Sequence, residues 1–261
     1  MLSKSRRFPW IWISIVLSVL IAIPIFAILY SLTDINVNTW VYLWETRLFT
    51  LIWNTLRLTL CVALLSFLLG TSLAWLVTMY DFPAKKWFEG LLLLPLAMPG
   101  YVIAFVFLSQ WDISGPFPQW LRQNWGITYW PDIRSFFWVS LLLSLVLYPY
   151  VYLLSRVAFK EQNISILEAA RCLGTSRKQL FWKVALPMAR PSIFVGTSFV
   201  MMETLADFGT VGIFSYDTFT TAIYQMWYGL FNQQAAIQLA SFLLLFALGI
   251  FYLEEQSRKN I

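Results

Sequence analysis

The chain is a succession of long apolar stretches separated by shorter polar segments. Six of the apolar stretches have the length and composition of helices that cross a bilayer, whose apolar core is about 30 Å thick. The pattern therefore predicts an all-α membrane protein with a single transmembrane domain over residues 1–261. The predicted spans lie at about 10–32, 51–79, 91–109, 135–157, 191–206 and 235–253.

The first apolar stretch has two interpretations. It runs from Phe8 to Leu32 behind three basic residues, as the apolar part of a signal peptide does. A signal peptide, however, has an apolar region of only about 7–15 residues, and no small-residue cleavage pattern precedes Thr33. We therefore expect a retained first span.

The third predicted span contains residues that interrupt helices. Pro95 and the pair Pro99-Gly100 lie inside it, and proline both removes a backbone donor and clashes with the preceding turn. We expect a kink or a break there. One interpretation of it is a kink that only serves packing.

The longest polar and basic segment between two spans covers residues 161–190. Ser165 and Glu168 have the spacing of a capping box, which predicts the start of a short helix. Gly174 is expected to end that helix, because glycine adopts the left-handed conformation that many helix C-termini need.

A second helix is predicted directly after this bend. Ser176 and Gln179 repeat the capping-box spacing. We expect Pro187 and Pro191 to stop the second helix before the fifth span. The segment is thus a helix, a glycine bend and a second helix.

This segment resembles the cytoplasmic signature of the permease subunits of binding-protein-dependent ABC importers. That signature reads E-A-A, three residues, G, nine residues and I-x-L-P, and the departure here is Val184 in place of isoleucine. The matching residues are Glu168, Ala169, Ala170, Gly174, Leu186 and Pro187.

The resemblance implies a type I ABC importer permease, in which residues 161–190 form a coupling segment that sits in a cleft of a cytoplasmic ATPase subunit. It implies as partners the ATPase subunits, a second permease half or subunit, a periplasmic or extracellular solute-binding protein and the lipid of a bacterial inner membrane, with no nucleic acid. The alternative is that Glu168 only caps its own helix within an ordinary basic loop. Capping and partner contact are compatible.

The distribution of basic residues independently supports a cytoplasmic position of the coupling segment. Of the 18 lysine and arginine residues, 14 fall on the side of the coupling segment and 4 on the other side. Because basic residues accumulate in cytoplasmic loops, the bias places the coupling segment and both termini in the cytoplasm. The net charge of +5 then needs no nucleic-acid partner.

Two acidic residues stand near the end of the fifth span. If the helix continues through Glu203 and Asp207, their carboxylates share one face, and acids at this depth usually face a bundle interior, a water-filled cavity or a partner. With Pro99 and Gly100 they form the candidate translocation pathway. In the alternative, Asp207 is a helix-end residue at the outer interface and Glu203 pairs with a neighbour such as Arg57.

The string from Glu203 to Gly212, E-T-L-A-D-F-G-T-V-G, resembles the ferric-iron branch of these permeases. The resemblance implies iron as the solute, while permeases for thiamine, phosphonate, sulfate and polyamines are relatives that stay open. A hard trivalent cation suits oxygen ligands, although nothing in the sequence shows that either carboxylate touches it. That branch often fuses two homologous halves, and one coupling segment here indicates one half, whether a separate subunit or an excerpt.

Composition narrows the function classes. The chain is 59% hydrophobic and 12% charged, it contains no histidine, and it has no Walker glycine-lysine loop. We therefore expect a transporter subunit and not an enzyme, with no metal, no cofactor, no disulfide between Cys61 and Cys172, and ATP hydrolysis in a separate subunit. An intramembrane enzyme with Glu203 and Asp207 as its carboxylate pair is a remote alternative, because such a pair normally comes from two helices. A passive channel is another.

The charge bias makes a topological prediction. In a chain whose two native cysteines are replaced by serine, Ser176→Cys should react only with thiol reagents supplied from the inner side, and Asn124→Cys only with impermeant reagents from the outer side. The opposite labelling pattern at either position would contradict the six-span arrangement.

Overall fold

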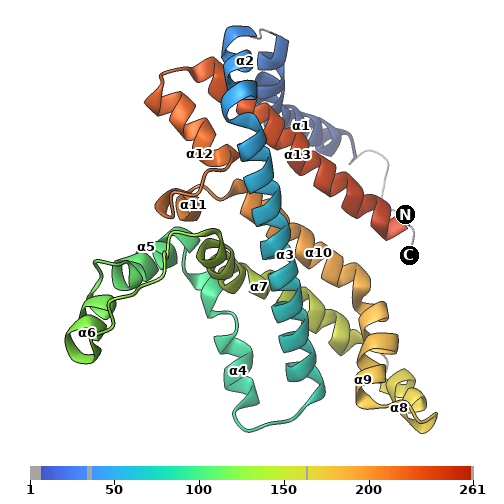
Figure 1. Ribbon diagram of the computed structural model, residues 1–261. Helices are drawn as coiled ribbons and strands as arrows, with labels where there is room; N and C mark the ends of the chain where they lie inside the picture. Colours follow the sequence, from blue (N-terminus) through green and yellow to red (C-terminus); the bar gives the residue numbers. More distant parts are fainter. Residues whose placement is uncertain (1–6, 34–36, 163, 260–261) are drawn as a thin grey trace.

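The computed structural model describes residues 7–33, 37–162 and 164–259, and their regular structure is entirely helical (Figure 1). The elements are α1 (Arg7–Tyr30), η2 (Ser31–Thr33), α2 (Val37–Thr46), α3 (Leu48–Met79), α4 (Lys85–Leu91), η3 (Leu94–Ala97), α5 (Gly100–Trp111), α6 (Pro116–Trp125), α7 (Phe136–Glu161), α8 (Ile164–Cys172), α9 (Arg177–Leu180), η4 (Phe181–Ala185), α10 (Leu186–Ala206), α11 (Gly209–Ile213), α12 (Phe219–Tyr224), η5 (Gln225–Gly229) and α13 (Gln233–Lys259). The expected all-α membrane fold is confirmed.

Five stretches within the described residues are long and apolar enough to cross a membrane: Trp10–Thr33, Leu48–Met79, Phe136–Glu161, Lys178–Ala206 and Gln233–Tyr252. A sixth span results if the bent pair Lys85–Ala97 and Gly100–Trp125, whose two parts meet at 90°, is counted as one.

The bend lies where the sequence predicted an interruption. Pro95 stands in the first turn of the 3-10 helix η3, and Pro99 is the N-cap residue of α5. Neither proline then has to supply a helical hydrogen bond, since the first amides of a helix have no partner within it. The third predicted span is therefore interrupted by a sharp bend, as in a broken span or a re-entrant loop, and is not a merely kinked helix.

Three helices, α3, α7 and α10, form the centre of the structure, and each packs against the other two (Figure 1). Val151 of α7 lies between two glycines. A Cβ atom built on Gly70 of α3 would lie 2.7 Å from the Val151 Cβ, and one built on Gly196 of α10 would lie 2.9 Å from the Val151 Cα. Small residues at such crossings allow helix backbones to approach closely.

A second apolar core lies where α2, α12 and the start of α13 meet the start of α3. The first span is attached to this part, because Gln238 of α13 donates a hydrogen bond to the carbonyl of Ser31 (3.0 Å) and the Ser241 hydroxyl donates to that of Ile28 (2.8 Å). In Figure 1, α1 runs beside α13, away from the central helices. Most of the α1 surface is left exposed.

The prediction that Pro187 and Pro191 stop the second helix of the coupling segment was wrong. A π-helical turn, η4, leads directly into α10, with Pro187 in its first turn and Pro191 inside it. At the junction the Leu186 amide bonds to the Phe181 carbonyl, five residues back. This local rewinding accommodates residues that lack an amide donor, so the helix continues and the fifth span begins before Pro191.

The glycine contacts make a prediction about stability. Gly70→Ala and Gly196→Ala should each destabilise the fold by about 1–3 kcal/mol, because the added methyl groups overpack the contact with α7. Gly249→Ala in α13 is the control, since a Cβ there meets nothing within 4 Å. Thermal unfolding of the detergent-solubilised variants provides the measurement. Equal midpoints for all three would contradict the close packing.

Candidate functional site

Gly174 ends α8 in the left-handed conformation, with φ of +83°. Its amide donates to the Arg171 carbonyl (2.9 Å), and the Thr175 amide donates to the Ala170 carbonyl (3.2 Å). This pair of bonds is a Schellman motif, which satisfies carbonyls that the end of a helix leaves free. The Thr175 hydroxyl donates to the same Ala170 carbonyl. The bend of the coupling segment is therefore fixed by the chain itself.

The capping box before α9 is present as predicted. The Gln179 amide donates to the Ser176 hydroxyl (3.3 Å), and the Ser176 amide donates to the Gln179 side-chain oxygen (3.1 Å). The start of α8 differs from the prediction, because the helix begins at Ile164 and Ser165 lies within it. The side chain of Ser165 is outside the described part of the structure, so its predicted capping bond is untested.

Aromatic packing joins the second half of the coupling segment to the spans. The ring centroid of Phe181 lies 5.0 Å from that of Trp75 in α3 and 6.4 Å from that of Phe159 in α7. The Gln162 side-chain amide, at the end of α7, donates to the Ala185 carbonyl (2.8 Å). These contacts join η4 to α3 and α7, and η4 leads directly into α10.

The six signature residues differ in exposure along the coupling segment. Glu168, Ala169 and Gly174 are exposed, whereas Ala170, Leu186 and Pro187 are half-buried. The E-A face and the bend are thus open to a partner, and the L-P end is packed into the protein.

The four candidate pathway residues line one cavity of about 260 Å³. Pro99 and Gly100 lie at the break of the third span. Glu203 lies in the last turn of α10, and Asp207 is the first residue after that helix. Tyr150 of α7 lies on the same wall and was missed by sequence reasoning, because a tyrosine within an apolar span carries no distinct signal.

Asp207 has a structural role at this cavity. Its carboxylate accepts hydrogen bonds from the amides of Thr210 (3.4 Å) and Val211 (3.0 Å), so it caps the short helix α11. Its backbone carbonyl accepts a bond from the Thr220 hydroxyl (2.7 Å). Asp207 therefore acts as a helix-end residue and lines the cavity as well.

Glu203 is exposed and is not paired with Arg57 in the described part of the chain. The Arg57 guanidinium instead lies over the ring of Phe136, 3.7 Å from its centroid, as a cation–π contact. Nor does any group of three histidine, cysteine, aspartate or glutamate side chains gather among the described residues. Glu203 and Asp207 thus line the cavity without a third such side chain close to them among the described residues.

Glycine contacts position the cavity wall. A Cβ on Gly209 of α11 would lie 2.6 Å from the Tyr101 Cβ in α5, and one on Gly100 would lie 3.1 Å from the Thr210 hydroxyl. The first turns of α5 and α11 therefore cross with almost no side chain between them. Larger residues at either glycine would move Asp207 relative to the break of the third span.

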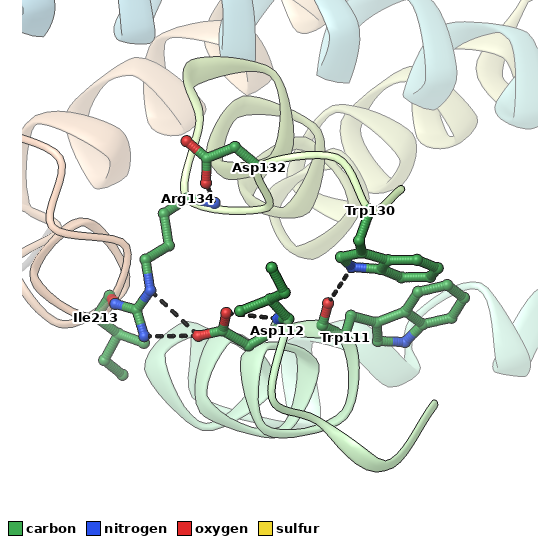
Figure 2. Close-up of polar contacts among 7 residues, drawn as sticks. Trp111, Asp112, Trp130, Asp132, Arg134 and Ile213 are labelled. Carbon is green, nitrogen blue, oxygen red and sulfur yellow. Dashed lines mark hydrogen bonds and ion pairs between the residues drawn. The ribbon is translucent and has the colours of Figure 1, made fainter. Parts of the chain in front are cut away.

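Arg134 connects α5 and α11 at their C-terminal ends through an ion pair and a hydrogen bond (Figure 2). The Arg134 guanidinium donates to the Asp112 carboxylate at 3.0 and 3.3 Å and to the Ile213 carbonyl at 3.0 Å. The Trp130 indole donates to the Trp111 carbonyl (2.7 Å) beside it. Sequence reasoning missed this ion pair, although Arg134 directly precedes the predicted fourth span.

Comparison with known proteins identifies the family. Residues 66–254 match the family described as binding-protein-dependent transport system inner membrane component. The chain is 29% identical, over 92% of its length, to the Fe(3+)-transport system permease protein FbpB 2 of Haemophilus influenzae, of which it spans 44%. It is 28% identical, over 74% of its length, to the probable sulfate transport system permease protein cysT of Marchantia polymorpha, of which it spans 66%.

The fold has a counterpart among solved structures. A chain of a bacterial ABC transporter involved in the import of the acidic polysaccharide alginate superposes with a TM-score of 0.77 at 18% identity, covering 99% of this chain and 98% of that one. The family match covers well over half of the sequence, including both the coupling segment and the acidic cavity. This chain therefore belongs to the binding-protein-dependent transport system inner membrane components.

Proposed function

We propose that the chain is one half of the permease of an ABC importer, that it lines the solute path at the acidic cavity, and that its coupling segment receives the movement of a cytoplasmic ATPase. The observation that carries this proposal is the physical continuity between the two sites. The coupling segment runs through η4 into α10 without a break, and the last turn of α10 presents Glu203 to the cavity. From Leu186 to Glu203 that helix is about 25 Å long.

The exposed face of the coupling segment supports an ATPase contact. Leu173, next to the bend, is 86% exposed and Ile166 is 44% exposed. Large apolar side chains on a polar cytoplasmic segment are typical of surfaces that a partner covers. Glu168, exposed beside them, is available to the same partner.

The arrangement of elements agrees with the proposed orientation. In Figure 1, α8 and α9 lie at one end of α3, near the segment that joins α3 to α4, and α2 lies at the opposite end. With the coupling segment in the cytoplasm, α2 and the tryptophan-rich region around α6 face the outside, where we propose that a solute-binding protein docks. Both termini are then cytoplasmic.

The charge of the cavity favours a cationic solute. Its described lining includes Glu203 and Asp207 and contains no lysine or arginine. An oxyanion such as sulfate would be repelled by both carboxylates, whereas a hard cation would be attracted. We therefore propose ferric iron over sulfate, in line with the iron-permease relative that matches most of this chain.

The bend allows a controlled test of coupling. Gly174→Val should reduce solute-stimulated ATP hydrolysis at least several-fold in reconstituted membranes, because a branched residue at positive φ distorts the segment that meets the ATPase. Gly249→Val in α13 is the control, since a Cβ there also meets nothing within 4 Å and Gly249 lies outside both the coupling segment and the region around α6. Solute-stimulated ATP hydrolysis at the wild-type level in Gly174→Val would contradict the proposed role of the bend. Solute uptake without any ATPase would indicate a passive channel.

The acidic cavity predicts a charge-dependent transport step. Glu203→Gln should lower iron uptake about tenfold or more with normal ATPase assembly, because two unit charges about 4 Å apart interact by about 4 kcal/mol at an effective dielectric constant near 20. Asp207→Asn should be similar, since asparagine retains an oxygen to cap α11. The control is Asp81→Asn, an exposed acid outside the cavity. Unchanged uptake by the double variant, or sulfate uptake by the wild type, would refute the cation proposal.

A further inference from the structure

We infer that a second cavity, between the coupling segment and the ends of α3 and α7, binds a phosphate-bearing glycerol headgroup, that of an anionic phospholipid or of a soluble ester with the same chemistry. This cavity, of about 370 Å³, is called the headgroup cavity below. The inference rests on the proposed cytoplasmic position of the coupling segment, which places the headgroup cavity at the inner membrane interface. It concerns regulation of coupling and no part of the solute path.

The headgroup cavity has an apolar side built from both spans and the coupling segment. Met79 ends α3, Phe159 lies in the last turns of α7, and Leu180 ends α9. Phe159 and Leu180 are almost completely buried. A small inorganic anion gains nothing from such a wall, whereas the glycerol backbone and first methylenes of a lipid can be buried against it.

The other side of the headgroup cavity is charged. Lys160 of α7 and Arg171 of α8 contribute two positive charges, and Glu168 of α8 contributes one negative charge. The resulting excess of one positive charge matches the single negative charge of a phosphate diester. Lysine and arginine are the usual phosphate-binding side chains, and basic cavities between helices at the cytoplasmic interface recur as lipid headgroup sites.

Two buried polar atoms of the lining have no hydrogen-bond partner. Gln162 is only 8% exposed, and its side-chain nitrogen donates to the Ala185 carbonyl, which leaves the side-chain oxygen unsatisfied. The buried Thr78 hydroxyl is also unpaired. Unpaired buried polar groups are costly, and a free amide oxygen needs a donor. A glycerol headgroup carries hydroxyl groups next to its phosphate, which suits a lining where Gln162 and Thr78 adjoin the Lys160 and Arg171 that would hold the phosphate.

Occupancy would affect coupling, because the headgroup cavity separates α8 from the spans. A bound headgroup ties Arg171, which lies in the turn before the glycine bend, to Lys160 and Thr78 at the ends of the spans. The coupling segment would then follow the spans more closely than it does with the cavity empty. Anionic lipid would thereby raise the efficiency with which ATPase movement reaches α10.

The test uses the permease purified with its ATPase and second half. The complex is incubated in detergent with phosphatidylglycerol or phosphatidylcholine, and the lipid that it retains is measured by native mass spectrometry. Wild type should prefer phosphatidylglycerol, and Lys160→Gln and Arg171→Gln should each lower its retention about fivefold. Lys86→Gln is the control, because it removes the same charge from an exposed position of α4 outside the cavity.

A second arm separates the two sources of the headgroup. Glycerophosphoglycerol, the soluble phosphate diester that remains when phosphatidylglycerol loses its acyl chains, is added to the same complexes without lipid, and their thermal unfolding midpoints are compared. A midpoint shift in wild type but not in Lys160→Gln, with no lipid preference, would assign the site to a soluble ester. Equal lipid retention and equal midpoints in wild type and both variants would overturn the inference. The ATPase co-purifies in either case if the proposed function is right, so the two failures are distinguishable.

Discussion

The contact of α3 and α10 with Val151 of α7 is the constraint on which the rest of the structure depends. Gly70 and Gly196 bring both backbones within van der Waals distance of α7 from two sides, so the three helices have little freedom to slide. Without a hydrophobic driving force between helices in lipid, this close packing is what holds the spans together. The broken span, α1 and α13 are attached around a rigid centre.

The π-helical turn η4 connects the coupling segment to α10, which belongs to this rigid centre. The turn begins at Phe181, whose ring packs against Trp75, and the prolines at positions 187 and 191 follow it. The regular helical hydrogen-bond pattern is therefore interrupted in this region. Below it, the Schellman motif and the capping box fix the bend at Gly174. The coupling segment thus has a locally fixed shape and continues through η4 into α10.

Local signals predicted local structure well. The spacing of Ser176 and Gln179, the glycine at 174 and the prolines at 95 and 99 each act within a few residues, and the structure places a capping box, a left-handed bend and a broken span at these positions. The prediction that Pro187 and Pro191 end the second helix was wrong, because a proline ends a helix only when the preceding turn cannot change its hydrogen-bond pattern. The meeting of Gly100 with Thr210, and of Arg134 with Asp112, depends on tertiary packing between distant segments and left no pattern in the sequence.

The two acids of the cavity serve different purposes, which explains how both can be tolerated near the apolar core. Asp207 accepts hydrogen bonds from two amides of α11, so its carboxylate is held in place within the protein whether or not a solute is present. Glu203 has no comparable bonds among the described residues and lies exposed at the cavity. Its carboxylate is therefore free to reorient toward the cation that we propose as the solute. A weak, temporary interaction of this kind would suit transport, since a cation held by a complete set of ligands would not leave.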